Sequence, residues 1–234
     1  MFTGLIQTVA EVISAQPIAP ATPTASGLDA AVRLVVQPGA WDYRPNPGDS
    51  IAVSGCCLTV ADHVEADRRI AFDVVPQTLR LTTLGDLLAG SKVNLEHAAR
   101  LDTLMGGHLV QGHIDGLGRV VGVENNLRGG VSGERDGEGV EGGEYRLRIA
   151  SAPGLMEFVV PKGSITVMGV SLTLAEVDPH GGAEGNGEFE VALIPTTLRE
   201  TTLGELVVGD MVNLEMDVTA KTVVHWLKNF GQGR

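Results

Sequence analysis

The fold is decided by a stretch that occurs twice in the chain. It reads Pro47-Gly-Asp-Ser-Ile-Ala-Val-Ser-Gly-Cys-Cys-Leu-Thr-Val60 in the first copy and Pro161-Lys-Gly-Ser-Ile-Thr-Val-Met-Gly-Val-Ser-Leu-Thr-Leu174 in the second. Both copies are rich in Val, Ile, Thr and Leu, which favours β-strands over Ser50–Val60 and Ser164–Val177.

Successive side chains on a strand point to opposite faces, and the two faces here differ in polarity. One face is apolar in both copies and belongs to a core: Cys56, Leu58 and Val60, matched by Val170, Leu172 and Leu174. The other is small and polar, which suits a surface that meets a polar ligand: Cys57 and Thr59, matched by Ser171 and Thr173. On this polar face the copies differ in chemistry at one point, where the thiol of Cys57 corresponds to the hydroxyl of Ser171.

Two further blocks repeat in the same order around the central one. Phe2–Val12 matches Val110–Val120, and Pro76–Glu96 is identical to Pro195–Glu215 at most positions. Repetition of this kind indicates two copies of one domain. We therefore expect one domain over residues 1–97, a second over 98–217, and a separate tail over 218–234.

Each copy is expected to contain short strands separated by turns. The other predicted strands are Gln7–Ile13, Ala31–Val36, Arg69–Val75, Lys92–Glu96, Gly118–Val123, Tyr145–Ala150, Glu188–Ile194 and Met211–Met216. A hydroxyl followed by an acid predicts a capped helical turn in Thr82–Leu88 and Thr201–Val207. Closely spaced strands with one short helix predict an all-β protein built from two small closed barrels.

Three segments and the tail depart from this pattern. Surface loops are expected at Glu124–Glu144, which is rich in Gly and Glu with almost no large apolar residues, at Pro17–Ser26, which is rich in Ala, Pro and Thr, and at His180–Gly187. The tail predicts an amphipathic helix over Val218–Phe230, with Val223, Val224, Leu227 and Phe230 along one face and a stop at Gly231. Its apolar face would pack on its own barrels or on another subunit.

Composition excludes several classes of protein. The 234 residues carry a formal net charge of −12 without a basic stripe, which disfavours nucleic-acid binding. No uncharged apolar run reaches the roughly 20 residues of a membrane span, and the sequence from Met1 lacks the features of a signal peptide. The only cysteines, Cys56 and Cys57, are adjacent, where a disulfide would be strained. We expect a soluble, cytoplasmic protein without a membrane partner.

The candidate chemical groups are histidines and a cysteine. His108 and His113 are either two unrelated structural histidines or include a proton-exchanging group, and His113 stands where the first copy has Leu5. Cys57 is either a small buried hydrophobe or a thiol directed at a ligand. No Cys-x-x-Cys or His-Glu-x-x-His motif supports a metal site, and no P-loop or Rossmann fingerprint is present.

The order of the motifs resembles the riboflavin synthase family of the α-chain type. The resemblance rests on Met1–Ile6, Gly55–Val60, Met105–His113, Gly169–Thr173 and the duplicated Thr-Thr-Leu-Gly, and it extends from Met1 to about Asp217. It implies two six-stranded Greek-key barrels plus a C-terminal helix. It also implies a homotrimer formed through those helices, which a lumazine synthase shell encloses in some relatives.

The resemblance also implies an activity. Two molecules of 6,7-dimethyl-8-ribityllumazine would react by transfer of a four-carbon unit, giving riboflavin and 5-amino-6-(D-ribitylamino)uracil without a metal or organic cofactor. The site would lie between the N-terminal barrel of one subunit and the C-terminal barrel of its neighbour. Ser50, Cys57 and His113 match the family's candidate catalytic residues.

Binding residues follow by motif match. The first lumazine is expected against Gly4, Leu5, Ile6, Cys56, Cys57, Leu58, Thr59, Asp73, Val74, Val75, Pro76, Gln77 and Thr78. The second is expected against Gly112, His113, Ile114, Lys162, Ser171, Leu172, Thr173, Ala192, Leu193, Ile194, Pro195 and Thr196, and Asp217 matches a further acid of the site.

The chain departs from the family pattern at four positions. Gln77 and Thr196 replace acids, and Ser54 and Met168 replace Asn and Asp before a glycine. Two alternatives to the enzyme follow: a non-catalytic lumazine- or flavin-binding antenna protein of the same fold, and a structural trimerisation module without a ligand.

Overall fold

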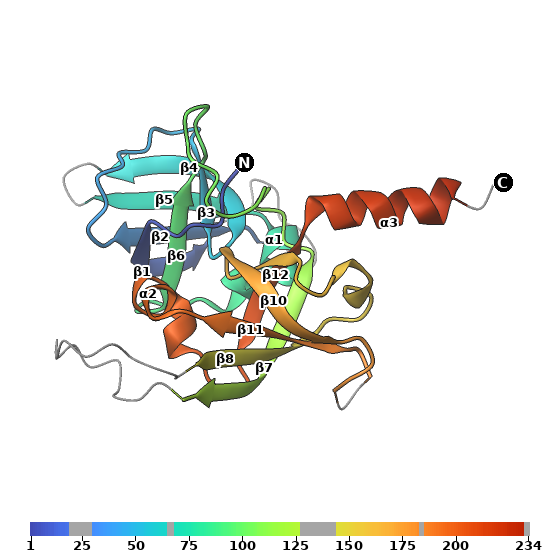
Figure 1. The fold of residues 1–234 in the computed structure, drawn as a ribbon. Helices are drawn as coiled ribbons and strands as arrows, with labels where there is room; N and C mark the ends of the chain where they lie inside the picture. Colours follow the sequence, from blue (N-terminus) through green and yellow to red (C-terminus); the bar gives the residue numbers. More distant parts are fainter. Residues whose placement is uncertain (19–29, 65–67, 127–143, 183–184, 232–234) are drawn as a thin grey trace.

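The computed structural model describes residues 1–18, 30–64, 68–126, 144–182 and 185–231. They form two closed six-stranded antiparallel barrels and a C-terminal helix that points away from them (Figure 1). The predicted all-β class with two homologous barrels is confirmed. Most of the expected loops at 17–26 and 124–144 lie outside the described residues.

Both barrels use the same Greek-key ring. The first closes in the order β1-β2-β5-β4-β3-β6, and the second in the matching order β7-β8-β11-β10-β9-β12. The strands of the first are β1 (Thr8–Pro17), β2 (Val32–Pro38), β3 (Ser50–Val53), β4 (Cys56–Val64), β5 (Arg69–Val74) and β6 (Lys92–His97). Those of the second are β7 (Gly116–Asn125), β8 (Tyr145–Ser151), β9 (Ser164–Val167), β10 (Val170–Asp178), β11 (Glu188–Leu193) and β12 (Met211–Met216).

Short helices connect the strands. They are α1 (Pro76–Leu81), η2 (Thr83–Asp86), η3 (Met156–Phe158), α2 (Pro195–Glu200) and η4 (Thr202–Glu205). Thr82 caps η2 and Thr201 caps η4 through their hydroxyls, as the sequence predicts. The prediction omitted α1 and α2, each of which begins at a proline, a residue suited to a first helical turn.

The prediction of one continuous strand through each central stretch is wrong. The chain turns back between β3 and β4 at Ser54 and Gly55, with φ of 44° and 85°, and between β9 and β10 at Met168 and Gly169, with φ of 51° and 83°. Two consecutive positive φ values are typical of a two-residue type I′ hairpin. Neither Ser-Gly nor Met-Gly is a common sequence for such a turn, which is why the turn was not predicted from the sequence.

The predicted division of faces holds on β4 and β10, the strands that follow these turns. Cys56, Leu58 and Val60 are buried in the first core, and their counterparts Val170, Leu172 and Leu174 are buried in the second. Cys57 and Ser171 are only partly buried, and Thr59 and Thr173 are exposed. Each barrel therefore has an aliphatic interior and, beside the hairpin, a polar outer strip, formed by Cys57 and Thr59 in the first barrel and by Ser171 and Thr173 in the second.

The barrels meet at the two hairpin turns through a reciprocal pair of buried amides. Asn94 Nδ2 donates to Met168 O at 2.9 Å, and Asn213 Nδ2 donates to Ser54 O at the same distance. Both asparagines are fully buried. Their Oδ1 atoms accept from backbone N–H groups across the interface: Asn94 from Thr202 N and Asn213 from Thr83 N, each at 2.8 Å.

The turn glycines touch at the centre of this interface. A Cβ atom built on Gly55 would lie 2.7 Å from Gly169 N, and one built on Gly169 would lie 2.7 Å from Gly55 N. No real Cβ fits at that distance, so any other residue would push the barrels apart.

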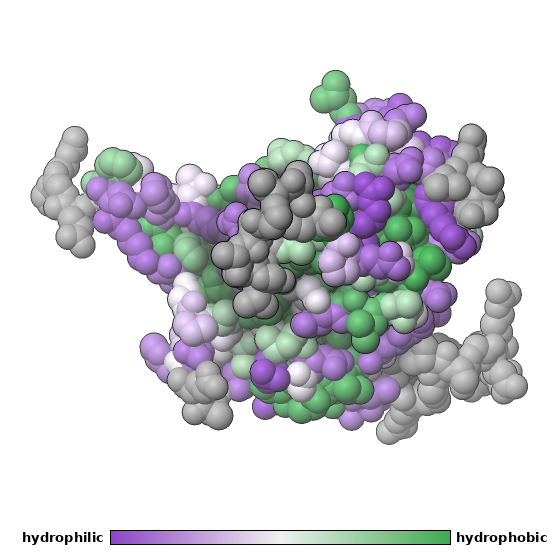
Figure 2. Space-filling model, turned by 180° about the vertical axis from the view of Figure 1, so that it is seen from behind, coloured by the Kyte–Doolittle hydropathy of each residue, from purple (hydrophilic) through white to green (hydrophobic). Residues whose placement is uncertain are grey.

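The tail helix α3 (Val218–Phe230) does not bury its apolar side chains on its own barrels. Asp217 caps its start by accepting from Thr219 N at 2.7 Å, and the helix then extends away from the barrels, with η3 of the second barrel beside it (Figure 1). Val223, Trp226, Leu227 and Phe230 are 52% to 66% exposed. From behind, the helix forms the arm at the left of Figure 2, where hydrophobic and hydrophilic side chains both lie open. None of the described helices is long and apolar enough to cross a membrane.

Replacing one buried amide should weaken the whole molecule. In Asn213→Ala, the Ser54 carbonyl and the Thr83 N–H lose their partners in a buried interface, and we expect a loss of about 3 kcal/mol in the free energy of unfolding. Urea denaturation measures this, with Asn126→Ala at an exposed position as the control. Equal stability of the two variants would contradict the role of the amide.

Candidate functional site

The segments that precede β1 and β7, which lead into the first and second barrels, cross over each other. Phe2 and Val110 pair in an isolated antiparallel bridge, with Phe2 N donating to Val110 O at 2.8 Å and Val110 N donating to Phe2 O at 3.2 Å. Beyond the bridge, Ser171 N donates to Gly4 O, and Cys57 N donates to Gly112 O, each at 2.8 Å. Each polar strip is thus completed by the leading segment of the other repeat.

This crossing corrects the grouping that the resemblance implied. Gly4 to Ile6 were grouped with Cys57, and Gly112 to Ile114 with Ser171, whereas the structure exchanges the two segments. Side-chain packing agrees, because Ile6 packs against the core of the second barrel and Ile114 against that of the first.

Two glycines make the crossing possible. A Cβ atom on Gly112 would lie 2.6 Å from the Cys57 Cβ, and one on Gly4 would lie 2.6 Å from the Ser171 Cβ. Both glycines also have positive φ, 79° and 75°, a conformation that other residues rarely adopt. The backbone of each crossing segment therefore lies directly on the opposite strip.

Two buried glutamates hold the crossing segments to their own barrels. Glu96 accepts from Thr3 N at 2.6 Å and from Gly4 N at 3.0 Å. Glu215 accepts from Gln111 N at 2.8 Å and from Gly112 N at 2.9 Å. Burial raises the pKa of both carboxyl groups, and the backbone donors offset part of that effect.

The first site is a cavity of about 260 Å³ beside β4. It is lined by Cys56, Cys57, Gln77, Thr78, Leu81, Thr82, Gly112, His113 and Ile114. Seven of these residues were predicted from the sequence. Leu81 and Thr82 were missed because α1 was not predicted; a helix through Gln77 and Thr78 brings residues three and four positions further on to the same face.

The two cysteines have different environments. Cys56 points into the core, where burial raises the pKa of its thiol to about 12. Cys57 lies on the outer strip and is partly exposed. Of the two, only Cys57 is placed to meet a ligand, and exposed His113 lines the same cavity from the crossing segment.

The second site lies on the corresponding strip of the second barrel. His108 Nδ1 is 2.7 Å from Ser171 Oγ, and burial lowers the pKa of this histidine. The sequence does not assign a role to His108, because the residue it contacts lies on a strand far away in the sequence. Lys162 is exposed in the turn before β9 with φ of 64°, where the first repeat has Gly48 with φ of 93°.

The remaining predicted residues fall into three groups. Leu58, Val74, Leu172 and Leu193 have side chains in the barrel cores, so only their backbone can meet a ligand. Leu5, Val75, Ile194, Pro195, Thr196 and Ala192 are exposed. Asp73 forms a bidentate ion pair with Arg33, which lowers the pKa of its carboxyl group, and Asp217 caps α3.

Ser50 shares the outer face with Cys57 but lies further along the sheet. It pairs with Thr59, whereas Cys57 pairs with Ala52. Among the described residues, those that line the cavity do not include Ser50.

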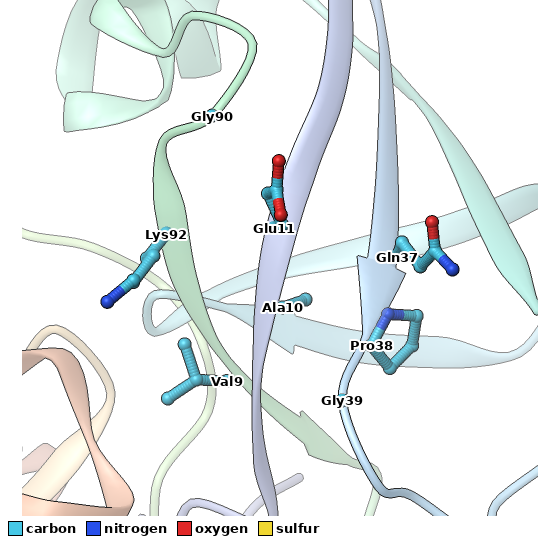
Figure 3. A pocket seen from close by; sticks show the side chains of 8 residues that line it. All are labelled: Val9, Ala10, Glu11, Gln37, Pro38, Gly39, Gly90 and Lys92. Carbon is cyan, nitrogen blue, oxygen red and sulfur yellow. The ribbon is translucent and has the colours of Figure 1, made fainter.

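A larger cavity of about 330 Å³ lies elsewhere on the first barrel (Figure 3). It opens between β1, the end of β2 and the start of β6, and it is lined by Val9, Ala10, Glu11, Gln37, Pro38, Gly39, Gly90 and Lys92. None of the predicted site residues lies there. Within the described part of the chain, no three His, Cys, Asp or Glu side chains gather into a possible metal site.

Comparison with known proteins gives one consistent result. A family model described as "Lumazine binding domain" matches residues 3–98 and 111–217. Riboflavin synthase of Mycobacterium bovis is 40% identical over 231 residues, covering 99% of this chain and 100% of the relative. That of Actinobacillus pleuropneumoniae is 34% identical, covering 97% and 90%.

Solved structures share the fold. The crystal structure of LumP complexed with riboflavin matches with a TM-score of 0.68 at 22% identity, covering 93% of this chain and 100% of that one. LumP complexed with 6,7-dimethyl-8-(1'-D-ribityl) lumazine matches with a TM-score of 0.66 at 21% identity, covering 93% and 99%.

Alkylation of Cys57 tests the crossed arrangement. Gly112→Ala would push its segment away from Cys57, so we expect the thiol to react with iodoacetamide several times faster than in the unchanged protein. Gly4→Ala is the matched control, because it disturbs the strip at Ser171 instead. Faster alkylation in Gly4→Ala than in Gly112→Ala would mean that the segments do not cross.

Proposed function

The chain belongs to the riboflavin synthase family, and we propose that its two crossed strips are the two lumazine sites of that family's reaction. Its activity is the conversion of two 6,7-dimethyl-8-ribityllumazine molecules into riboflavin and 5-amino-6-(D-ribitylamino)uracil, the last step of riboflavin biosynthesis. It is a transferase, since a four-carbon unit passes from one lumazine to the other.

The proposal rests on one observation: the two strips have the same backbone arrangement but carry different side chains. Both strips present the same strand geometry and the same crossing glycine, which suits two identical substrate molecules. Their side chains differ: Cys57 against Ser171, and His113 against Leu5. Two copies of one substrate can therefore be held in different chemical environments, one as donor and one as acceptor.

The residues at the first strip have assignable roles. Addition at C7 of lumazine needs a nucleophile. Cys57 lines the cavity, where it can attack itself or orient a water molecule that attacks, whereas Ser50 lies further along the sheet. The methyl group at C7 is acidic because the ring delocalises the resulting anion, so a modest base suffices. His113 is the candidate base, since imidazole exchanges protons near neutral pH.

The second strip supplies polar contacts. Ser171 and Thr173 offer hydroxyl groups, and Lys162 can pair with an acceptor oxygen or with the anionic ring. Holding two lumazines face to face contributes to the rate through proximity and orientation.

We also propose that the reacting pair forms between subunits of a homotrimer. The apolar side chains of α3 are open to solvent, and more are exposed near the two sites, among them Val75 and Leu81 at the first and Ile194 and Leu5 at the second. Large exposed apolar side chains gathered along one helix are typical of an interface. A cytoplasmic location fits two adjacent cysteines that are not bonded to each other.

The test of the activity mixes the protein with 6,7-dimethyl-8-ribityllumazine alone and follows riboflavin by absorbance. One riboflavin for every two lumazines consumed supports the proposal. Bound lumazine without riboflavin would instead favour the antenna-type binder, and no binding at all would favour a structural module.

Cys57→Ser and His113→Gln should each lower kcat, the latter by about a hundredfold if His113 is the general base. Both should leave lumazine affinity nearly unchanged, because each keeps a polar side chain of similar size. Steady-state kinetics and fluorescence titration of lumazine measure the two effects. His180→Gln, an exposed histidine in a turn, serves as the control. Unchanged rates in both site variants would refute these roles.

Removal of the tail tests the assembly. A chain ending at Asp217 should sediment as a monomer, whereas the full chain should sediment at three times its 24.5 kDa mass. If the reacting pair forms between subunits, the shortened chain should still bind lumazine but lose turnover. A shortened chain that remains trimeric would show that α3 does not hold the subunits together.

A further inference from the structure

The segment that carries His113 is fixed on both sides by carboxylates. Before His113, Glu215 accepts from the backbone N–H groups of Gln111 and Gly112. After it, Asp115 Oδ2 accepts from Met216 N at 2.8 Å, while Asp115 N donates to Leu214 O at 2.9 Å. The position of the imidazole therefore depends on contacts with the end of β12.

The first repeat makes the same contact without a charge. Gln7 stands at the position of Asp115, its Oε1 accepts from His97 N at 3.0 Å, and its N donates to Leu95 O at 3.0 Å. A neutral amide thus suffices for the hydrogen bond to the strand. The charge of Asp115 needs another explanation.

Lys221 of the tail helix supplies that explanation. Its Nζ lies 2.8 Å from Asp115 Oδ2 and 3.0 Å from Oδ1, and each of the two side chains is only 22% exposed. Lys221 lies in the first turns of α3, where the helix dipole disfavours a positive charge. The lysine is therefore placed against the intrinsic preference of the helix, and Asp115 is the partner that compensates it.

Glu215 takes part in the same group of charges. Burial is the main cause that raises the pKa of Glu215; the nearby ammonium of Lys221 has a smaller, lowering effect on this pKa, and the carboxylate of Asp115 a smaller, raising one. Without Lys221, two carboxylates would face each other around the segment that carries His113.

We propose that Lys221 and Asp115 form a positioning link, through which the tail helix fixes the segment that carries His113. The inference rests on the proposed function, because it concerns the residue proposed as the base. Neither residue touches the cavity; both act on His113 through the backbone between Gly112 and Met216.

The test uses Lys221→Met, Asp115→Asn and the double variant. Asparagine keeps the acceptor for Met216 N, so the substitution removes the charge but not the strand contact. Each single variant should lower kcat about fivefold and leave KM within about twofold. Because the two residues act as one unit, the double variant should be no slower than the slower single variant.

Lys228→Met is the matched control. Lys228 pairs with Glu157 of η3, so this variant also removes an ion pair between α3 and the second barrel, but one that does not reach His113. It should keep the kcat of the unchanged protein. A loss equal to that in Lys221→Met would overturn the proposal, since any loosening of α3 would then have the same effect.

Two further results would overturn it: full kcat in Asp115→Asn, or losses that multiply in the double variant. Sedimentation of each variant distinguishes a loss of kcat caused by dissociation of the trimer from one caused by displacement of His113. If substitutions on α3 disturb the trimer, the kcat of Asp115→Asn alone tests the proposal.

A second readout does not depend on turnover. The ¹H–¹³C NMR signal of the His113 ring should shift in Asp115→Asn and Lys221→Met but not in Lys228→Met. If the unchanged protein forms no riboflavin, the proposed function fails while this measurement still tests the link.

Discussion

The buried contact between the two hairpin turns is the constraint on which the rest of the structure depends. Asn94 and Asn213 each bond to the turn of the opposite barrel, and Gly55 lies against Gly169 without room for a side chain. Buried amides are costly unless all their polar atoms are paired, so the barrels fit together in one arrangement only. That arrangement brings the polar strip of each barrel within reach of the other's leading segment.

Much of this fold could be predicted for two reasons. Side chains on a strand return to the same face every two residues, and the sequence contains two copies of one domain. The alternation around Cys57 identified the buried and the outer faces correctly, and the matched blocks indicated two homologous barrels. The hairpins at Ser54 and Met168 could not be predicted, because a type I′ turn is identified by Asn-Gly or Asp-Gly. A serine and a methionine adopt positive φ there since the interface holds them in place.

The sequence named most of the residues that line the cavity beside β4, but it missed Leu81 and Thr82 and grouped the crossing segments with the wrong barrels. Internal repetition shows which residues correspond, such as Gly4 and Gly112, but it does not show on which barrel each segment lies. That choice depends on contacts between residues far apart in sequence, which no local pattern encodes. His108 could not be assigned for the same reason: its partner Ser171 becomes its neighbour only when the barrels have met.

The crossing of the leading segments also sets an order of events during synthesis. Gly4 lies against Ser171, so the first segment leaves the ribosome long before the strand on which it finally rests has been made. At common elongation rates this interval is on the order of ten seconds. The first barrel can close during that time, but Gly4 and its neighbours remain without their partner strand. Contacts between such distant parts of a chain form slowly, so the two sites are expected to be among the last features of the molecule to mature.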